Sequence, residues 1–198
     1  KQVALDLVRW ADVLAESFSP RAMKTFGLDY ETLRSVNPDL IMLSTCLMGQ
    51  TGPLAMFAGY GNLAAAITGF YLITGWQDRE PAGPFGAYTD YIAPRYNALA
   101  VLAALDHRQR TGTGQHIDLA QVEAAMHFIT PALLDYTANG NVQARLGNRD
   151  LNWAPHGAYP VSGEDQFIAL ACETDEHWRA LCTLIPALDG EDPGFLHA

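Results

Sequence analysis

A short run of six residues, 40–45, places the strongest limit on what this chain can fold into. The run reads Leu-Ile-Met-Leu-Ser-Thr and follows the Asn37-Pro38 step. A strand whose apolar residues do not alternate with polar ones has to be covered on both faces. The run therefore predicts a strand inside a parallel sheet, with helices on either side.

The segments before this run alternate in the way that such a sheet requires. Residues 2–10 place apolar side chains near one helical face, and residues 11–16 form a short, partly apolar strand. Asp29 can cap a helix that continues to Val36, where the Asn-Pro step stops it. Helices and strands in alternation predict an α/β fold with a parallel sheet.

The loop of residues 17–27 follows the carboxyl end of the first expected strand and leads into a helix. Loops in this position hold the phosphates of ligands in many parallel α/β sheets. The side chains there that suit an anionic ligand are Ser17, Phe18, Arg21 and Lys24. Arg21 and Lys24 can equally be two exposed charges on a short helix.

Residues 49–61 form a loop rich in glycine and proline that leads into a helix expected over residues 62–74. Small side chains make one face of that helix smooth, which permits close approach of a neighbouring helix or of another subunit. Residues 59–64 also match GxGxxA, the dinucleotide-binding pattern. That pattern needs a strand directly before it, and no strand pattern precedes Gly59.

Asp90 lies where the longest helix of the chain should begin. A loop with Gly83 and Gly86 precedes it, Pro94 falls in the expected first turn, and apolar residues recur at helical spacing as far as Gly112. An aspartate at a helix start is most often an N-cap that accepts a hydrogen bond from a backbone amide. Its ordinary pKa of about 3.9 also keeps it ionised at neutral pH, so it can act as a nucleophile without a general base.

The remainder of the chain continues the alternation and then changes character. Residues 115–119 alternate as a strand, and residues 121–138 form a helix with an expected kink at Pro131. Residues 142–157 are irregular and rich in arginine and aromatic residues, which is typical of an active-site loop or of a simple connector. A hairpin and a helix, over residues 158–184, complete a small α+β region.

Composition excludes several classes of function. With 198 residues, 49% of them hydrophobic and 17% charged, the chain can bury a sizeable core. A net charge of −10 argues against a nucleic-acid partner, and no apolar run is long enough for a membrane span. Three cysteines without a CxxC pair indicate a reducing cytoplasm, and the six histidines show no metal-ligand spacing, so we expect no metal site.

A longer pattern extends from Asp90 to Ala124. It reads D-Y-x5-N-A-x-A-x-L-A-A-L-x2-R-x-R-T-G-x-G-Q-x-I-D-L-x-Q-x-E-A. Four further blocks stand in order around it: residues 26–41, 49–53, 59–60 and 145–149. Together they resemble the family III CoA-transferases, which include the formyl-CoA, carnitine and benzylsuccinate CoA-transferases. The resemblance extends from about Leu5 to the end of the chain.

The resemblance implies a domain organisation. Residues 1–140 would be part of a Rossmann-like parallel-sheet domain with long helices, and this part would carry the nucleophile. Residues 141–198 would be a linker and the start of a smaller α+β domain. The chain would be a fragment that lacks a C-terminal part and an N-terminal segment, and that segment supplies a glutamine to the active site in this family. We therefore expect the fragment alone to be inactive and the complete protein to be an interlocked homodimer.

The resemblance also implies an activity, that of an acyl-CoA:carboxylate CoA-transferase with Asp90 as the catalytic residue. Asp90 would attack the donor thioester to give an aspartyl acyl anhydride, and CoA would pass to an acceptor acid through an aspartyl-CoA thioester. CoA and acyl-CoA would be substrates, with no permanently bound cofactor. The partners would be an acyl-CoA donor and a carboxylic acid acceptor, without nucleic acid or membrane, in the cytoplasm.

The implied CoA contacts lie on two loops. They are Ser17, Phe18, Arg21, Lys24, Tyr60 and Gly61. Family members carry Asn-Phe where this chain has Ser17-Phe18, and an arginine where it has Thr25, so a neighbouring basic residue would substitute. Residues 59–69 and 145–160 look most like the benzylsuccinate CoA-transferase branch, which implies an aromatic or a dicarboxylic acid.

Two other functions compete with transfer. The α-methylacyl-CoA racemases of the same superfamily use an aspartate at this place together with a histidine to move an α-proton. Tyr60 stands at the position of that histidine, and a phenol with a pKa of about 10 is a poor base beside an imidazole. Racemisation or isomerisation is the second hypothesis, and a non-catalytic CoA-binding fragment is the third.

Overall fold

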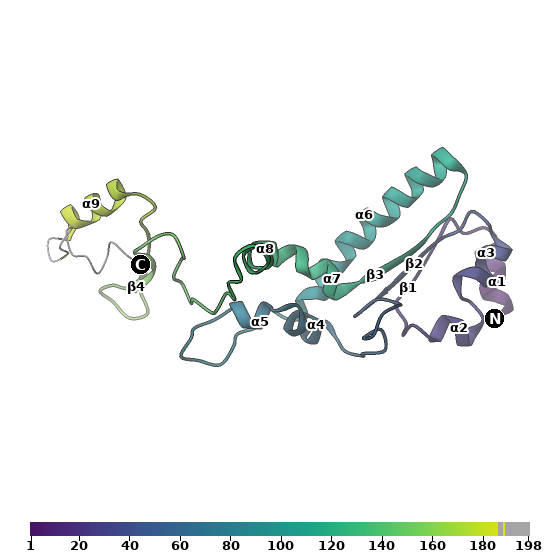
Figure 1. Cartoon of the computed structure of the whole chain (residues 1–198), viewed down its shortest axis with the longest axis horizontal. Coiled ribbons are helices and arrows are strands. Elements are labelled where there is room, and N and C mark those ends of the chain that lie inside the picture. The colour runs from purple at the N-terminus through teal and green to yellow at the C-terminus, as the bar shows by residue number, and fades with distance from the viewer. Residues whose placement is uncertain (186–187, 189–198) are drawn as a thin grey trace. The chain divides into compact units, whose positions relative to one another are not determined.

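The structure is a computed structural model that describes residues 1–185 and 188, drawn in Figure 1. The chain forms two compact units, Lys1–Leu72 with Gly83–Gln143, and Ile73–Ala82 with Ala144–Ala198. The second unit therefore draws on two separate segments of the chain. The functional boundary expected at residue 140 stays a prediction.

A parallel sheet of three strands forms the centre of the first unit, in the order β1-β2-β3. The strands are β1 (Val13–Glu16), β2 (Ile41–Cys46) and β3 (His116–Ala120). In the register, Val13 of β1 pairs with Ile41 of β2, and Met42 of β2 pairs with His116 of β3. The first four residues of β2 are buried, so the predicted strand with two covered faces is confirmed.

Three short helices cover one face of this sheet. They are α1 (Gln2–Val8), α2 (Ala22–Phe26) and α3 (Tyr30–Val36). Each helix contributes one residue, Val8, Met23 or Leu33, to a core cluster with Leu40 and Met42. The predicted N-cap of α3 is confirmed. The side chain of Asp29 accepts a hydrogen bond of 3.1 Å from the amide of Thr32.

The longest helix, α6 (Tyr88–Thr111), packs on β2 and β3. Successive side chains of a strand point to opposite faces, so Ile41 and Leu43 point away from the cluster that holds Met42. Both are buried, which is consistent with α6 covering that second face. Among the described helices, α6 included, none combines the length and the apolar composition needed to cross a membrane.

The helix expected over residues 62–74 is interrupted. Helix α4 (Gly61–Thr68) ends at Gly69, which has a left-handed φ of 110°, and α5 (Phe70–Ile73) follows. The sequence did not predict this break, because the alanines before it favour a continuous helix. Ala64 and Ala65 are fully buried, and α4 packs against α6 and against α7 (Gln121–Met126). Helices of the same unit therefore cover the small side chains that were expected to admit a close neighbour.

Two prolines lie at places that differ from expectation. Helix α6 begins at Tyr88, two residues before Asp90, so Pro94 falls in the second turn and leaves the Asp90 carbonyl without its helical amide donor. The expected kink at Pro131 is a break between α7 and α8 (Thr130–Asn139), filled by the 3-10 turn η1 (His127–Ile129). Pro131 cannot donate to the carbonyl of His127, and the Thr130 hydroxyl donates to it instead at 2.8 Å.

The second unit contains the predicted hairpin and helix. Strands β4 (His156–Pro160) and β5 (Phe167–Ala171) are antiparallel, and α9 (Asp175–Leu184) follows them. The hydroxyl of Thr174 caps α9 by accepting a hydrogen bond of 3.3 Å from the amide of His177. The amide of Gly147 donates to the carbonyl of Gly75 at 2.8 Å, and this bond joins the two segments of the unit.

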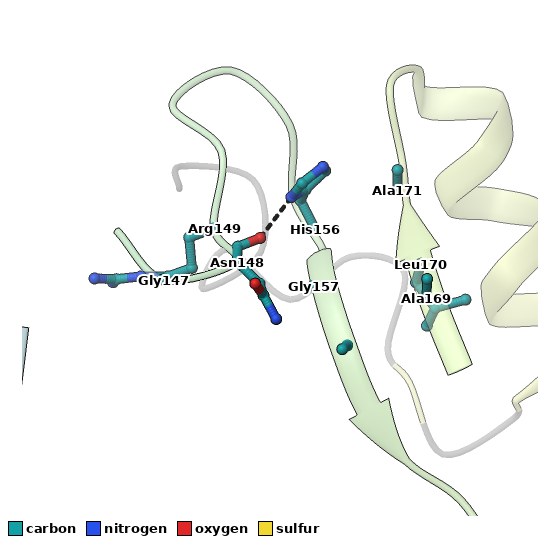
Figure 2. A pocket seen from close by; sticks show the side chains of 9 residues that line it. Gly147, Asn148, Arg149, His156, Gly157, Ala169, Leu170 and Ala171 are labelled. Carbon is teal, nitrogen blue, oxygen red and sulfur yellow. Dashed lines mark hydrogen bonds between the residues drawn. The ribbon is translucent and has the colours of Figure 1, made fainter. Parts of the chain in front are cut away.

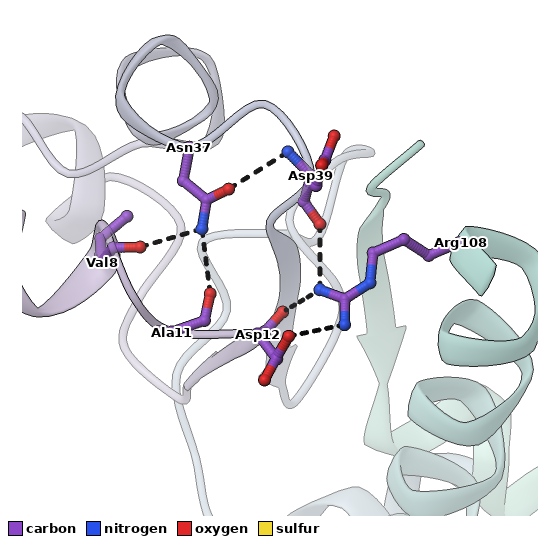
Figure 3. Close-up of polar contacts among 6 residues, drawn as sticks. All are labelled: Val8, Ala11, Asp12, Asn37, Asp39 and Arg108. Carbon is purple, nitrogen blue, oxygen red and sulfur yellow. Dashed lines mark hydrogen bonds and ion pairs between the residues drawn. The ribbon is translucent and has the colours of Figure 1, made fainter. Parts of the chain in front are cut away.

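Arg108 ties the end of α6 to the start of two strands, as Figure 3 shows. Its Nη1 donates to the carbonyl oxygens of Asp12 and Asp39 at 3.2 and 3.3 Å, and its Nη2 donates to the Asp12 carboxylate at 2.7 Å. Just beyond, a Cβ on Gly114 would lie 2.2 Å from the carbonyl oxygen of Leu40. Only glycine fits there. Residues 108–114, the R-x-R-T-G-x-G stretch, therefore connect α6 to β3 closely enough for β3 to pair with β2, and we call this connection the joint.

This joint yields a prediction for stability. The substitution Arg108→Met keeps the apolar stem and removes three hydrogen bonds, so we expect the free energy of unfolding to fall by about 1–3 kcal/mol. Urea denaturation followed by circular dichroism measures the change. The matched control is Arg110→Met, whose ion pair with Asp106 is exposed and should contribute less than about 0.5 kcal/mol. Equal losses in the two variants would contradict the role of Arg108.

Candidate active site

The carboxyl ends of the three parallel strands meet at one edge of the sheet, where a cavity of about 340 Å³ opens. Ser17 directly follows β1, Thr45 and Cys46 end β2, and Gln121 directly follows β3. All four residues line the cavity. Ligands of parallel α/β sheets bind outside this edge, so the strand order itself marks the cavity as the candidate site.

Helix α6 brings Asp90 to the same edge. The helix belongs to the crossover from β2 to β3, and a helix that connects parallel strands runs antiparallel to them. Its first turn therefore lies beside the carboxyl ends of the strands. Asp90 is the third residue of α6, is exposed to solvent and lines the cavity.

The carboxylate of Asp90 does not cap its helix. The N-cap residue of α6 is Ala87, and no side chain makes a cap hydrogen bond there, so the N-cap interpretation of Asp90 is wrong. Its Oδ1 accepts a hydrogen bond of 2.9 Å from Nε2 of Gln121, which is 31 residues away in sequence. Within the part of the chain that the structure describes, no donor is bonded to Oδ2.

Thr89 connects the loop before α4 to this pair. It is fully buried, and its hydroxyl donates to the carbonyl oxygen of Gly61 at 3.0 Å. The same hydroxyl lies 3.5 Å from Oε1 of Gln121, a weaker contact because one hydroxyl has one proton to donate. Thr89 therefore fixes the Gly61 backbone beside Asp90 and lies close to the amide that holds the carboxylate.

Gly61 is in place because Asp90 leaves no room for a side chain. A Cβ at Gly61 would lie 2.8 Å from both Cγ and Oδ2 of Asp90, and 2.9 Å from the Cβ of Ala87. These separations are shorter than normal contacts between such atoms, so any larger residue would displace the carboxylate. Gly61 does not line the cavity, and its place in the site is against Asp90.

Cys46 is a second nucleophile in the same cavity. Burial raises the pKa of its thiol, and the nearby carboxylates of Asp118 and Glu16 raise it further. The thiol therefore stays protonated at neutral pH, and a protonated thiol is a poor nucleophile. Asp90 is the better candidate for covalent chemistry because a carboxylate nucleophile needs no general base.

Apart from Gly61, the residues expected to contact CoA divide into two groups. Ser17, Phe18 and Tyr60 line the cavity together with Asp90. Arg21 and Lys24 do not line it, and both are exposed at the start of α2 and within it. The structure therefore brings the aromatic and hydroxyl groups to the carboxylate and keeps the two cations outside.

Gln121 and Thr45 are among the cavity residues that were not singled out from the sequence. Gln121 appeared only as one letter of the long pattern, and Thr45 only as the last residue of a strand. The signal that identifies both is their position, since each lies at the carboxyl end of a parallel strand. The hydroxyl of Thr45 is buried and has no hydrogen-bond partner among the described residues.

A separate cavity of about 500 Å³ lies inside the second unit, between residues 147–149 and the β4–β5 hairpin (Figure 2). Nδ1 of His156 lies 2.6 Å from the carbonyl oxygen of Asn148, so Nδ1 carries the ring proton. Figure 2 shows the side chain of Arg149 pointing away from the hairpin and from His156. Residues 147–149, 156 and 157 of the irregular stretch thus line this cavity, and the side chains of Arg149 and His156 do not converge there.

Known proteins provide an independent comparison. The family model described as CoA-transferase family III matches residues 1–195. The succinate–glutarate CoA-transferase of Agrobacterium fabrum is 39% identical over 179 residues, which cover 90% of this chain and 44% of that protein. The acetyl-CoA:oxalate CoA-transferase of Acetobacter aceti is 35% identical over 198 residues, which cover 99% of this chain and 50% of that protein. The chain spans about half the length of these relatives.

A solved structure agrees with the sequence relatives. The crystal structure of a CAIB/BAIF family protein from Brucella suis matches 99% of this chain and 52% of its own, with a TM-score of 0.84 and 36% identity. The expected α/β fold and the expected family are therefore both confirmed. The chain belongs to CoA-transferase family III.

Proposed function

We propose that the protein is an acyl-CoA:carboxylate CoA-transferase in which Asp90 is the covalent nucleophile. One observation carries the proposal: an exposed carboxylate, bonded to a single neutral donor, lines a cavity at the carboxyl edge of the sheet. The named relatives are CoA-transferases, which supports CoA transfer as the class of reaction.

The first half of the reaction forms two intermediates in turn. Oδ2 of Asp90 attacks the carbonyl carbon of the donor thioester, the carbon–sulfur bond breaks, and CoA leaves as a thiolate. The product on the enzyme is a mixed anhydride between Asp90 and the donor acyl group. The thiolate then attacks Cγ of Asp90 and expels the donor acid as a carboxylate, which leaves an aspartyl-CoA thioester.

The second half runs the same chemistry with the acceptor acid. The acceptor carboxylate attacks Cγ of the aspartyl thioester and expels the CoA thiolate, which gives a second mixed anhydride. The thiolate then attacks the acceptor carbonyl carbon and breaks its bond to the bridging oxygen, which came from the acceptor carboxylate and stays on Asp90 in place of the oxygen that left with the donor acid. Acceptor acyl-CoA leaves, and Asp90 is a carboxylate again.

Gln121 has a place in these steps that follows from its hydrogen bond. Whenever Cγ of Asp90 is attacked, negative charge develops on the carboxyl oxygen that is not the bridging atom. Because Nε2 of Gln121 already lies 2.9 Å from Oδ1, it can donate to that oxyanion without further movement. In this mechanism Gln121 both orients the free carboxylate and stabilises each tetrahedral intermediate at Cγ.

We propose that CoA contacts two sets of residues, one inside the cavity and one outside it. Ser17, Phe18 and Tyr60 remain our proposed contacts inside the cavity. Arg21 and Lys24 stand outside it and are available to the phosphates of CoA. All three cysteines are free thiols, which fits the reducing cytoplasm where we place the protein.

The nucleophile is tested by the substitution Asp90→Asn in the full-length enzyme. A neutral amide cannot form the anhydride, so we expect the fold to be retained and transfer to fall by at least about a thousandfold. In the unmodified enzyme, hydroxylamine added with acyl-CoA should convert the acylated side chain to a hydroxamate. Mass spectrometry should locate that change on the peptide that contains Asp90.

The matched control is Asp106→Asn, the same change on an exposed residue of the same helix. Asp106 pairs with Arg110 far from the cavity, so we expect full activity and no effect on the label. Full activity of Asp90→Asn, or a hydroxamate on another peptide, would remove Asp90 from the mechanism. An enzyme that binds CoA but shows neither turnover nor label would support the non-catalytic alternative.

Proton abstraction by a racemase-like site gives a different isotope result. The residues described as lining the cavity include no histidine, and Tyr60, at the position of the racemase base, is 84% exposed. We therefore expect no exchange of the α-hydrogen when the full-length enzyme is incubated with 2-methylbutanoyl-CoA in deuterated water. Rapid deuterium uptake in the absence of an acceptor acid, followed by mass spectrometry, would favour the racemase instead.

We propose that the protein is a homodimer and that the second copy covers the outer face of α6. Tyr91, Leu99 and Leu102 are all more than half exposed and recur on one side of that helix. We expect sedimentation velocity of the full-length protein to give the mass of a dimer, and Leu99→Glu to shift it toward the monomer. The control Val3→Glu, on an exposed part of α1, should leave the mass unchanged. A monomer at every concentration would contradict the dimer.

A further inference from the structure

The cavity beside Asp90 is lined by both polar and apolar side chains. Thr45, Gln121 and Asp90 are polar and lie at the edge of the sheet. Leu47, Met56 and Phe57 are apolar, and we call these three residues the apolar wall. A ligand that matches both kinds of lining has a polar group and an apolar body.

The apolar wall is itself incompletely covered. Met56 and Phe57 are 52% and 44% exposed, although both side chains line the cavity. Large apolar side chains that stay open to water beside a reactive group gain free energy when a ligand covers them. The wall therefore favours a hydrocarbon tail over a polar one.

The charges of the cavity lining also favour an uncharged tail on the ligand. Asp90 is the sole charged residue among those described as lining the cavity, and no lysine, arginine or histidine joins it. A carboxylate moved from water to the apolar wall would lose hydration without gaining a counter-ion, and the charge on Asp90 would repel it. The two nearby cations, Arg21 and Lys24, lie outside the lining.

We propose that the acid served by this site carries a single carboxyl group and an uncharged aliphatic or aromatic tail that lies on the apolar wall. The inference rests on the proposed function, since it assigns the class of acid for the same site. The reacting carboxyl group lies at the sheet edge, beside Asp90 and Gln121. The chain would differ in this respect from the relatives named for succinate, glutarate and oxalate.

Two acids of equal chain length separate a charged tail from an uncharged one. Pentanoate and glutarate both have five carbons, and they differ in a terminal methyl group against a terminal carboxylate. The full-length enzyme is assayed with butyryl-CoA and, separately, with succinyl-CoA as donor. We expect kcat/KM with butyryl-CoA to be at least about tenfold higher for pentanoate than for glutarate, because the second carboxylate stays unpaired.

A variant of the wall tests where the tail lies. Phe57→Arg supplies a cation at the apolar wall, so we expect the pentanoate-to-glutarate ratio to fall by about tenfold. Val3→Arg adds the same charge to an exposed position of α1, away from the cavity, and should leave the ratio unchanged. An unchanged ratio in Phe57→Arg would overturn the placement of the tail.

The donor arms separate failure of this inference from failure of the proposed function. Transfer that is efficient only from succinyl-CoA to glutarate would overturn the inference while CoA transfer itself stands. The same holds if glutarate is the better acceptor with both donors. Absence of transfer in every arm, together with absence of a hydroxamate on Asp90, would end the proposed function and the inference with it.

Discussion

Burial of β2 on both faces is the constraint on which the rest of the first unit depends. Its backbone pairs with β1 and β3, its Met42 side chain joins the core cluster with residues of α1, α2 and α3, and α6 packs on the same strand. A strand in this position needs crossover connections, because parallel neighbours cannot be joined by a tight turn. The crossovers bring three strand ends and the start of α6 to one edge, so the candidate site follows from the topology.

The two ends of α6 have different tasks. About 27 Å of helix separates Arg108 from Asp90, given a rise of 1.5 Å per residue, which exceeds the roughly 20 Å spanned by a six-residue strand such as β2. The helix therefore reaches from one edge of the sheet to the other. Because Arg108 and Gly114 fix its end against the starts of the strands, the first turn and Asp90 are held at the opposite edge.

Local patterns predicted the elements well and the contacts between them poorly. The buried strand, the cap at Asp29 and the helix stop at Gly112 each depend on a few adjacent residues, and the structure has all of them. The break at Gly69 was missed because packing, and not the local sequence, decides whether a single glycine in an alanine-rich run ends the helix. The Gln121–Asp90 hydrogen bond joins residues 31 positions apart, and no local pattern reports such a distance.

In the mechanism we propose, a single negative charge moves between groups, and the site has to stabilise it without holding it on Asp90. Each step moves one negative charge, from the Asp90 carboxylate to the CoA thiolate, then to the released acid, and back. No step creates a second charge or transfers a proton, so neither a general acid nor a general base is required. A fixed cation beside Asp90 would favour the free carboxylate over the thiolate and over the departing acid, which would slow two of the exchanges. A neutral donor such as Gln121 avoids that bias, because it donates to Oδ1 both in the free carboxylate and when charge develops on Oδ1 at a tetrahedral Cγ, and it is itself unchanged when the charge moves away.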